Sequence, residues 1–309
     1  MKILVTGGAG FIGSTVVDAY IAAGHDVVVV DNLDSGRMEN VNPQAKFYLM
    51  DVRSPDLKKV FELEKIDVIN HHAAQKSVPH SVEDPILDAQ INILGILNLL
   101  ELAVEYGVKR VIFSSTGGAL LGDAEVIPTP EESPVQTISP YAITKYTSEK
   151  YLEFYRLTHG LTYVVLRYAN VYGPRQIAEG ECGVTPIFLD NLLNDRPSKL
   201  YAYPDMPDGC TRDYVYVGDV ARANVLALEK GDNLIFNIGT GQEVSTSQVY
   251  RYLQAATGKY DVPLIPAGAR VGDLRRSALD ITRAREVLGW EPQVDFPTGL
   301  KETVAYFQK

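Results

Sequence analysis

The 309-residue chain has an ordinary globular composition, 46% hydrophobic and 22% charged, which excludes a disordered or fibrous protein. Acidic residues outnumber basic ones by 39 to 29, so the formal charge is -10 and nonspecific binding to nucleic acid or to an anionic membrane is not expected. The two cysteines, Cys182 and Cys210, are too few for a disulfide framework and lack the spacing of metal ligands, so we expect incidental thiols.

The first five residues resemble the start of a secretory signal peptide only superficially. Three spaced glycines interrupt the apolar run by Gly13, and no small-residue cleavage site follows it. No apolar run approaches the roughly 20 residues of a membrane span. We therefore expect a soluble, cytoplasmic protein of one or two domains, without a membrane as partner.

The first half of the chain alternates short β-branched runs with stretches of helical periodicity. Six runs are rich in valine and isoleucine on both faces, as buried parallel strands are, and lie at residues 2–6, 26–30, 46–49, 67–70, 110–113 and 162–166. Helical periodicity covers residues 12–23, 55–64, 84–106 and 140–158. This alternation predicts an α/β fold with a doubly wound parallel sheet.

The second half of the chain is less regular. A unit at residues 217–229 and 233–238 repeats the helix–strand order and is expected to add a strand to the sheet. The remainder is rich in proline, glycine and turn signals, with short helices expected at residues 245–256, 282–288 and 297–307. We predict one domain from residues 1–170 and 217–243, and a smaller, discontinuous C-terminal domain from residues 171–216 and 244–309. The smaller domain would cap the carboxyl ends of the strands, where ligands of such sheets bind.

The first predicted strand runs directly into a glycine-rich turn, Thr6 to Gly13, and then into a helix. In this order of elements Gly7 permits a tight turn, Gly10 lets the backbone approach a pyrophosphate, and Gly13 allows close helix–strand packing. The helix N-terminus offers free N–H groups to the anion. The pattern predicts a dinucleotide site of the Rossmann type.

An acidic residue, Asp31, ends the second predicted strand, eighteen residues after Gly13. A carboxylate there accepts hydrogen bonds from both ribose hydroxyls and repels a 2′-phosphate, so NAD is favoured over NADP as the cofactor. Arg37 could serve the phosphate of NADP, but with Asp31 in place we interpret it as a surface arginine.

Tyr141 and Lys145 stand four residues apart on the predicted helix, so their side chains share a face. The helix follows Pro140, and a strand ending at Thr116 precedes it at the carboxyl edge of the sheet. An ammonium about 4 Å from a phenol, at an effective dielectric near 20, favours the phenolate by about 4 kcal/mol, or about 3 pK units. We therefore predict a general base that works near neutral pH beside an oxidised nicotinamide.

Together these residues resemble the extended short-chain dehydrogenase/reductase family of nucleotide-sugar enzymes, over essentially the whole chain. The resemblance depends on the glycine motif with Asp31, Asp51-Val52, Ala73-Ala74, Asn92, Thr116 and the pair Tyr141/Lys145. Within this NAD-dependent epimerase/dehydratase group, the chain is most similar to the members that interconvert UDP-glucose and UDP-galactose.

The resemblance implies a set of NAD-binding residues at the carboxyl ends of the strands. They are Gly7, Gly10, Phe11, Ile12, Gly13, Asp31, Asn32, Asp34, Ser35, Gly36, Asp51, Val52, Ala73, Ala74, Gln75, Asn92, Ser114, Tyr141, Lys145 and Tyr168. Lys145 would also bind the nicotinamide ribose. The adjacent His71 and His72 end a strand and point to opposite faces, so no metal site is expected.

The residue after the catalytic threonine distinguishes the reactions of this family. Dehydratases and decarboxylases commonly carry an acid there, whereas Thr116 is followed by Gly117, Gly118 and Ala119, which leaves C4 epimerisation as the simplest chemistry. In the implied mechanism Tyr141 removes the C4 hydroxyl proton while Thr116 hydrogen-bonds that hydroxyl. NAD accepts the C4 hydride, the 4-keto sugar turns over about its phosphate linkage, and the hydride returns to the other face.

The resemblance also implies the residues that bind the UDP-sugar. Asn170 would hydrogen-bond the diphosphate or the sugar, Arg212 and Arg270 would clamp the diphosphate, and Asp273 would bind the uridine ribose. The substrate set is completed by Thr116, Tyr141, Lys76 and Ser277. Ser277 stands where a tyrosine would exclude an N-acetyl group, so we expect N-acetylated UDP-hexoses to be accepted.

Two segments depart from the family pattern near the substrate. Leu120-Leu121-Gly122 lacks the tyrosine that relatives usually have, and the loop at residues 203–209 is longer and lacks a Gly-Asp-Gly turn. An epimerase of UDP-hexuronic acids or of N-acetylated sugars is therefore the alternative enzyme, and a non-catalytic NAD sensor is a distant one. Relatives pair through the helices that correspond to residues 84–106 and 140–158, which implies a homodimer.

Overall fold

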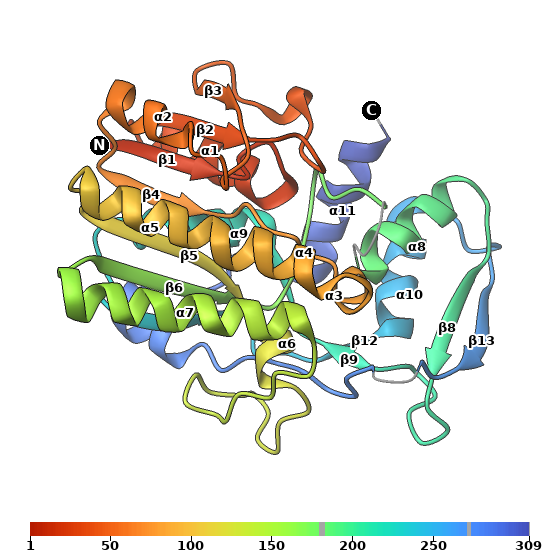
Figure 1. The fold of residues 1–309 in the computed structure, drawn as a ribbon. Coiled ribbons are helices and arrows are strands. Elements are labelled where there is room, and N and C mark those ends of the chain that lie inside the picture. Colours follow the sequence, from red (N-terminus) through yellow and green to blue (C-terminus); the bar gives the residue numbers. More distant parts are fainter. Residues whose placement is uncertain (179–182, 271–272, 309) are drawn as a thin grey trace.

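The computed structural model describes residues 1–178, 183–270 and 273–308. Its described residues form a central parallel sheet in the strand order β11-β6-β5-β4-β1-β2-β3 (Figure 1). In chain order these strands are β1 (Lys2–Thr6), β2 (Asp26–Asp31), β3 (Lys46–Leu49), β4 (Val68–His71), β5 (Arg110–Thr116), β6 (Thr162–Tyr168) and β11 (Leu234–Ile238). The order reverses between β1 and β4, which creates the crevice where doubly wound sheets bind ligands. The predicted fold class is confirmed, and β11 is the added strand.

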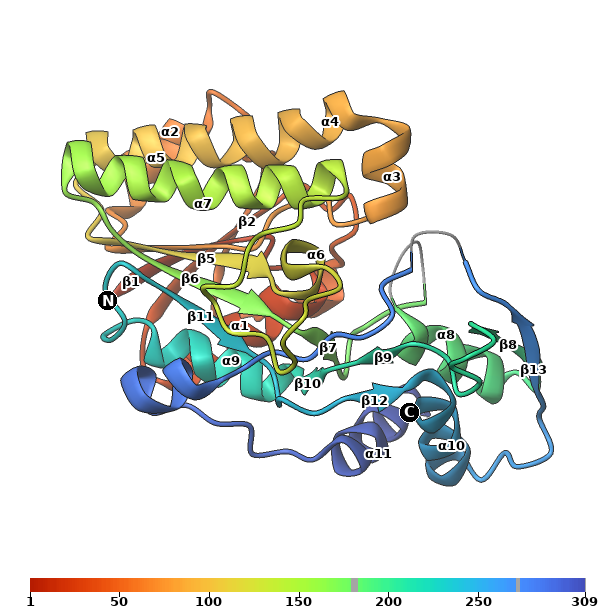
Figure 2. The ribbon, with the colours of Figure 1, turned by 90° about the horizontal axis from the view of Figure 1, so that it is seen from below.

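Helices cover both faces of the sheet, as Figure 2 shows. On one face α1 (Phe11–Ala22) and α9 (Val217–Leu226) bury side chains such as Val16 and Val220 against the strands. On the other face lie α2 (Leu57–Glu64), α5 (Gly95–Glu105) and α7 (Pro140–His159), with Leu99 and Leu152 in a second apolar cluster. The strands are thus buried from both sides, which is why their valine and isoleucine runs are continuous rather than alternating.

The helix expected at residues 84–106 consists of α4 (Pro85–Ala89), one wide π-turn (Gln90–Leu94) and α5. The side chain of Asp84 caps it by accepting from the N–H of Leu87 at 2.9 Å. Contrary to the sequence-based expectation, Pro85–Glu105 is long and apolar enough, by length and composition alone, to cross a membrane. In the fold, however, Ile96, Leu99 and Leu100 are buried in the core beside α7, and core helices pass the same test.

The cap lies beyond the carboxyl ends of the strands (Figure 2). Its helices are α8 (Val184–Leu193), α10 (Thr246–Thr257) and α11 (Phe296–Phe307), and its paired strands are β7 (Asn170–Tyr172) with β10 (Tyr214–Tyr216), β8 (Ser198–Ala202) with β13 (Leu264–Gly268), and β9 (Thr211–Arg212) with β12 (Val244–Ser245). These elements share a third apolar cluster that includes Tyr172, Phe188, Tyr250 and Leu300. Segments far apart in the sequence therefore build one small core.

Several elements were not expected from the sequence. Helices α3 (Val78–Glu83) and α6 (Gly118–Leu121) are too short for a helical period to develop, and α8 was not expected either. At residues 281–290 the side chains of Ile281, Leu288 and Trp290 join the core beside α9 and β11 rather than the cap core. Cys210 is a buried free thiol, and Cys182 lies outside the described residues.

Candidate active site

The turn between β1 and α1 is built from glycines that leave no room for a side chain. Gly7 has a φ of +69°, and a Cβ there would lie 2.6 Å from the main-chain nitrogen of Ala73. At Gly13 a Cβ would lie 2.2 Å from the carbonyl oxygen of Gly7. Gly10 precedes α1 and offers no capping side chain, so the first N–H groups of the helix, from Phe11 onward, have no side-chain acceptor from the cap. The cradle therefore fits the pyrophosphate of NAD.

The carboxylate of Asp31 lies at the end of β2 against this turn. Its oxygens accept hydrogen bonds from the N–H groups of Ala9 at 3.0 Å and Leu33 at 2.8 Å. Gly36 packs on the same carboxylate, since a Cβ there would lie 2.7 Å from Asp31 Oδ1. The guanidinium of Arg37 lies 3.5 Å from the exposed carboxylate of Glu39. This arrangement fits an unphosphorylated ribose at Asp31.

The other residues expected near the adenosine divide into exposed and buried ones. Asn32, Asp34 and Ser35 are exposed, and Asn32 donates a hydrogen bond to Asp51 at 3.3 Å. Two hydrogen bonds from the Arg53 guanidinium to Asp51 lower the pKa of that carboxyl. Val52 is buried beneath them in the core. The ends of β2 and β3 thus bring the expected adenosine residues together.

Hydrogen bonds from the π-turn (Gln90–Leu94) fix the loop that follows β4. Asn92 accepts from the Gln75 N–H at 2.9 Å and donates to the Gln75 carbonyl at 3.0 Å. Ala73 and Ala74 are partly buried in this loop, whereas Lys76 is exposed. The side chain of Asn92 therefore fixes the main chain of Gln75, in the loop that is expected to line the nicotinamide.

The two adjacent histidines point to different neighbours. His71 Nδ1 lies 2.7 Å from the Thr6 hydroxyl, while His72 Nε2 lies 3.3 Å from the Tyr168 hydroxyl at the end of β6. Burial, and secondarily the charge of Lys145, lower the pKa of both histidines, that of His72 to about 3. Among the described residues, no three His, Cys, Asp or Glu side chains are grouped to hold a metal ion.

The catalytic candidates meet where β5 ends and α7 begins. Helix α7 begins at Pro140, after the Ser139 side chain accepts from the Ala142 N–H. Lys145 Nζ lies 5.9 Å from the ring centre of Tyr141 and donates to the Ser114 carbonyl at 2.9 Å. Thr116 is two residues further along β5 and is partly exposed.

The ammonium of Lys145 is almost completely shielded from water. The residue is only 5% exposed, and its Nζ lies 4.8 Å from the centre of the Phe113 ring. This burial lowers the pKa of Lys145 to about 8, although the carboxylates of Asp88 and Glu149 oppose the shift. A lysine poised close to neutral pH is typical of an active site.

Two segments of the cap carry three of the expected substrate residues. Arg212 ends β9 and donates to the Thr211 carbonyl at 2.8 Å. The guanidinium of Arg270 stacks 4.0 Å above the ring of Tyr201, and the Asp273 carbonyl accepts from Tyr203 at 3.1 Å. Residues 271 and 272 of this motif lie outside the described residues.

Two further substrate candidates reach the same edge of the sheet. Asn170 is exposed on β7, beside β10. Ser277 is 8% exposed and faces the turn after Thr116, because a Cβ on Gly118 would lie 3.4 Å from its hydroxyl. Cap and sheet therefore meet directly at the expected reaction centre.

One known protein family matches most of this chain. The model of the NAD-dependent epimerase/dehydratase family matches residues 3–239. The chain belongs to this family. Membership agrees with the glycine turn, with Asp31 and with the pair Tyr141/Lys145, and it confirms the resemblance identified from the sequence.

Three solved structures of this family are similar over nearly the full length. A UDP-glucose 4-epimerase from Thermotoga maritima, solved with UDP-glucose, is 50% identical with a TM-score of 0.96, over 100% of this chain and 99% of that chain. A UDP-glucose 4-epimerase from Thermus thermophilus, solved with NAD, is 44% identical with a TM-score of 0.94 and the same coverage. A UDP-N-acetylglucosamine 4-epimerase from Methanobrevibacter ruminantium, solved with UDP-N-acetylmuramic acid, is 34% identical with a TM-score of 0.92, over 99% and 98%.

Sequence reasoning missed several polar residues around the family's catalytic pair. Glu149 and Arg167 form a buried ion pair at 2.7 Å, and Asp88 is fully buried on α4. Tyr201 lies beneath Arg270 on a cap strand. The i+4 spacing of Glu149 from Lys145 was a usable signal, whereas nothing in the sequence distinguishes Asp88 from a surface acid.

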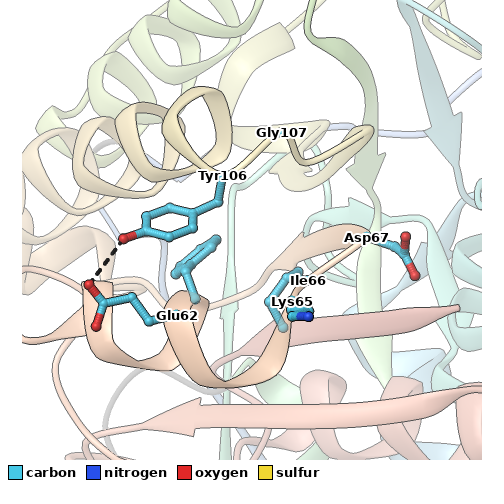
Figure 3. A pocket seen from close by; sticks show the side chains of 7 residues that line it. Glu62, Lys65, Ile66, Asp67, Tyr106 and Gly107 are labelled. Atoms are coloured by element: carbon cyan, nitrogen blue, oxygen red, sulfur yellow. Dashed lines mark hydrogen bonds between the residues drawn. The ribbon is translucent and has the colours of Figure 1, made fainter.

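A separate pocket of about 410 Å³ lies at the opposite edge of the sheet (Figure 3). It is lined by Phe61, Lys65, Asp67 and other residues of α2 and the turn after α5. Across it Tyr106 donates a hydrogen bond to Glu62 at 3.3 Å. None of its lining residues belongs to the predicted site.

Proposed function

We propose that this protein is an NAD-dependent enzyme that interconverts the C4 epimers of a UDP-hexose. The first candidates for this pair of epimers are UDP-glucose and UDP-galactose. The observation that supports the proposal is Lys145, whose Nζ lies 5.9 Å from the ring centre of Tyr141 and donates to the Ser114 carbonyl, two residues before Thr116 at the end of β5. The relatives solved with UDP-glucose and with NAD support the choice of ligands.

The residues of the site have distinct tasks in this reaction. Bound NAD would accept a hydride from C4 of the sugar and return it. The Tyr141 phenolate removes the proton of the C4 hydroxyl and later gives it back, while the Thr116 hydroxyl hydrogen-bonds the same oxygen. The Lys145 ammonium favours the phenolate, and its dry surroundings strengthen that attraction.

The turn after Thr116 argues against elimination chemistry. Gly117 has no side chain, and a Cβ there would lie 2.5 Å from a methyl carbon of Leu279, so an acid could enter this position only if the Leu279 side chain moved. A 4-keto sugar formed here would find no carboxylate from this position to expel a neighbouring substituent. After the sugar has turned over, return of the hydride to its other face completes the epimerisation.

The UDP group is proposed to be held from the cap. Arg212 and Arg270 would bind the diphosphate, Asn170 would bind its sugar end, and Asp273 would bind the uridine ribose. Asp213, next to Arg212, accepts from the N–H groups of Thr240 at 2.8 Å and Leu279 at 3.2 Å and so fixes this clamp to the sheet. A firm hold on UDP leaves the small hexose free to turn over.

The substrate range is proposed to include N-acetylated UDP-hexoses. Ser277 faces the glycine turn after Thr116, and its small side chain occupies less of the space there than a tyrosine would. The similar UDP-N-acetylglucosamine 4-epimerase supports this extension.

Assembly as a cytoplasmic homodimer is part of the same proposal. Helices α4, α5 and α7 expose large apolar side chains, including Ile86 at 70%, Phe154 at 51% and Leu157 at 70%. Such a face is typical of an interaction surface. Light scattering after a sizing column should report twice the 34.0 kDa chain mass, and a mass of one chain would reject the dimer.

We also propose that the chain divides into two domains. One consists of residues 1–170 and 217–243, and the smaller one consists of residues 171–216 and 244–309.

One experiment tests the proposed function directly. Purified protein is incubated with UDP-glucose, UDP-N-acetylglucosamine and UDP-glucuronic acid, and the C4 epimers are separated by chromatography. Conversion of UDP-glucose supports the proposal. Conversion of UDP-glucuronic acid alone would assign the uronic acid reaction, and no conversion of any sugar would favour a non-catalytic NAD protein.

A further inference from the structure

Asp88 is a buried carboxylate that the reaction described above does not use. It lies on α4 with no solvent-exposed surface. One oxygen accepts hydrogen bonds from Gln75 at 2.9 Å and Asn92 at 3.0 Å, and the other accepts from Thr144 at 2.7 Å. Thr144 directly precedes Lys145 on α7. The carboxylate therefore joins the loop expected to line the nicotinamide to the helix that carries the catalytic lysine.

The second buried carboxylate near Lys145 already has a counter-ion. Glu149 receives two hydrogen bonds from the Arg167 guanidinium, at 3.0 and 2.7 Å, and one from the Ser115 hydroxyl at 2.6 Å. Asp88, by contrast, forms no ion pair within 4 Å in the described part of the chain. A buried charge without a counter-ion is costly, and in the described part of the chain neither Asp88 nor Lys145 has an ion-pair partner within 4 Å.

We propose that Asp88 is a positioning residue that keeps the Lys145 ammonium protonated in its dry site while fixing Gln75 and Thr144 on either side. This inference rests on the proposed function for its effect on catalysis, but the charge state of Lys145 can be measured independently of activity.

The charges around Lys145 act on its protonation. Burial lowers the pKa of Lys145 to about 8, and the negative charge of Asp88, together with that of Glu149, opposes this shift. Burial also raises the pKa of Asp88, an effect that the Thr144 hydrogen bond and the Lys145 charge oppose. The other titratable groups that face this pair are Tyr141, Glu149 with Arg167, His71, His72 and, toward Asp88, His80.

A purely structural role would not require a charge at this position. An asparagine amide at position 88 could accept from Gln75 and Asn92 through its oxygen and donate to the Thr144 hydroxyl. The single proton of that hydroxyl would then turn to the Tyr141 carbonyl, which lies 3.1 Å away. Asp88→Asn therefore removes the charge and keeps the same groups hydrogen-bonded. Thr144→Val removes the hydroxyl that contacts Asp88, Asn92 and the Tyr141 carbonyl, and it keeps the carboxylate.

The experiment follows Lys145 by NMR in protein purified with its NAD and labelled with ε-13C lysine. The Lys145 signal is assigned by its loss in Lys145→Arg and titrated in wild type, Asp88→Asn and Thr144→Val. The same proteins are assayed for kcat and KM with UDP-glucose across pH. Asp88→Ser is a second charge-removing variant in case Asp88→Asn does not fold.

We expect charge removal to lower the Lys145 pKa by about 1 unit, as loss of a nearby opposite charge does. The alkaline decline of kcat should move to lower pH by the same interval, with little change in KM. Thr144→Val, which keeps the carboxylate, should shift the Lys145 pKa less than the charge-removing variants do. An unchanged Lys145 pKa in the charge-removing variants, or an equal shift in Thr144→Val, would overturn the inference. A shifted pKa without any epimerase activity would support it while rejecting the proposed function.

Discussion

Replacing Lys145 by methionine should abolish activity and yet make the protein more stable at neutral pH. Methionine has a similar length and fills the same space over Phe113 without a charge. In the wild type, burial lowers the pKa of Lys145 from its ordinary 10.5 to about 8. Each pK unit corresponds to about 1.4 kcal/mol, so keeping this lysine charged and buried costs about 3 kcal/mol below pH 8.

The pH dependence identifies the origin of that cost. Between pH 8 and 10.5 the folded wild type binds fewer protons at Lys145 than the unfolded chain, so its stability rises with pH relative to the variant. Loss of the hydrogen bond to the Ser114 carbonyl reduces the variant's advantage by about 1–2 kcal/mol at every pH. The stability difference should therefore favour Lys145→Met by about 1–2 kcal/mol at pH 7 and decline by about 3 kcal/mol toward pH 10.5.

Urea unfolding of nucleotide-free protein at pH 7, 8, 9 and 10 measures this difference. Lys150→Met is the matched control, because Lys150 lies on the same helix with its side chain 58% exposed. The control difference should change little over this range. A stability difference for Lys145→Met that does not depend on pH would refute the assignment of Lys145 as a dry, charged lysine.

Four further predictions concern the site. Tyr141→Phe should keep NAD and UDP-sugar binding while lowering kcat by about 10²–10⁴-fold, and normal turnover would reject Tyr141 as the base. Ser277→Tyr should abolish conversion of UDP-N-acetylglucosamine and spare UDP-glucose in the epimer assay, and equal loss on both sugars would reject Ser277 as the gate. NAD should copurify with the wild type, as extraction of heat-denatured protein would reveal. Gly13→Ala should weaken NAD binding in a fluorescence titration and lower stability by about 1–3 kcal/mol through its 2.2 Å contact, whereas Gly268→Ala, with open space around it, should do neither.

The sheet was predictable because its strands are marked by composition. β1 and β3 were predicted with the bounds that the structure has. β1 is a buried, continuous apolar run, whereas β3 is a partly exposed edge strand that contains Phe47 and Tyr48, residue types that favour strands. The expected end of β6 fell short, at residue 166, because the strand continues through the polar Arg167 to Tyr168. A polar residue at a strand end departs from the apolar pattern by which the strand was predicted.

The support of the site was not predictable in the same way. Tyr141, Lys145 and Asp31 follow motifs with fixed spacing, so sequence alone singles them out. Asp88 is one acid within a helix, and its role depends on burial and on partners 13 and 56 residues away, at Gln75 and Thr144. Long-range partners of this kind leave no periodic trace in the chain.

The composition of the cap core has a consequence for the order of folding. The ring of Tyr172 packs 4.8 Å from that of Phe296, a residue 124 positions later, and Gly299 has no room for a Cβ beside the Tyr172 hydroxyl. Closing a loop of that length costs about 4 kcal/mol of chain entropy before its contacts form. During synthesis the strands from β1 to β6 can pair well before α11 leaves the ribosome. The pairing of these strands can therefore precede completion of the cap core, which requires Phe296 to reach Tyr172.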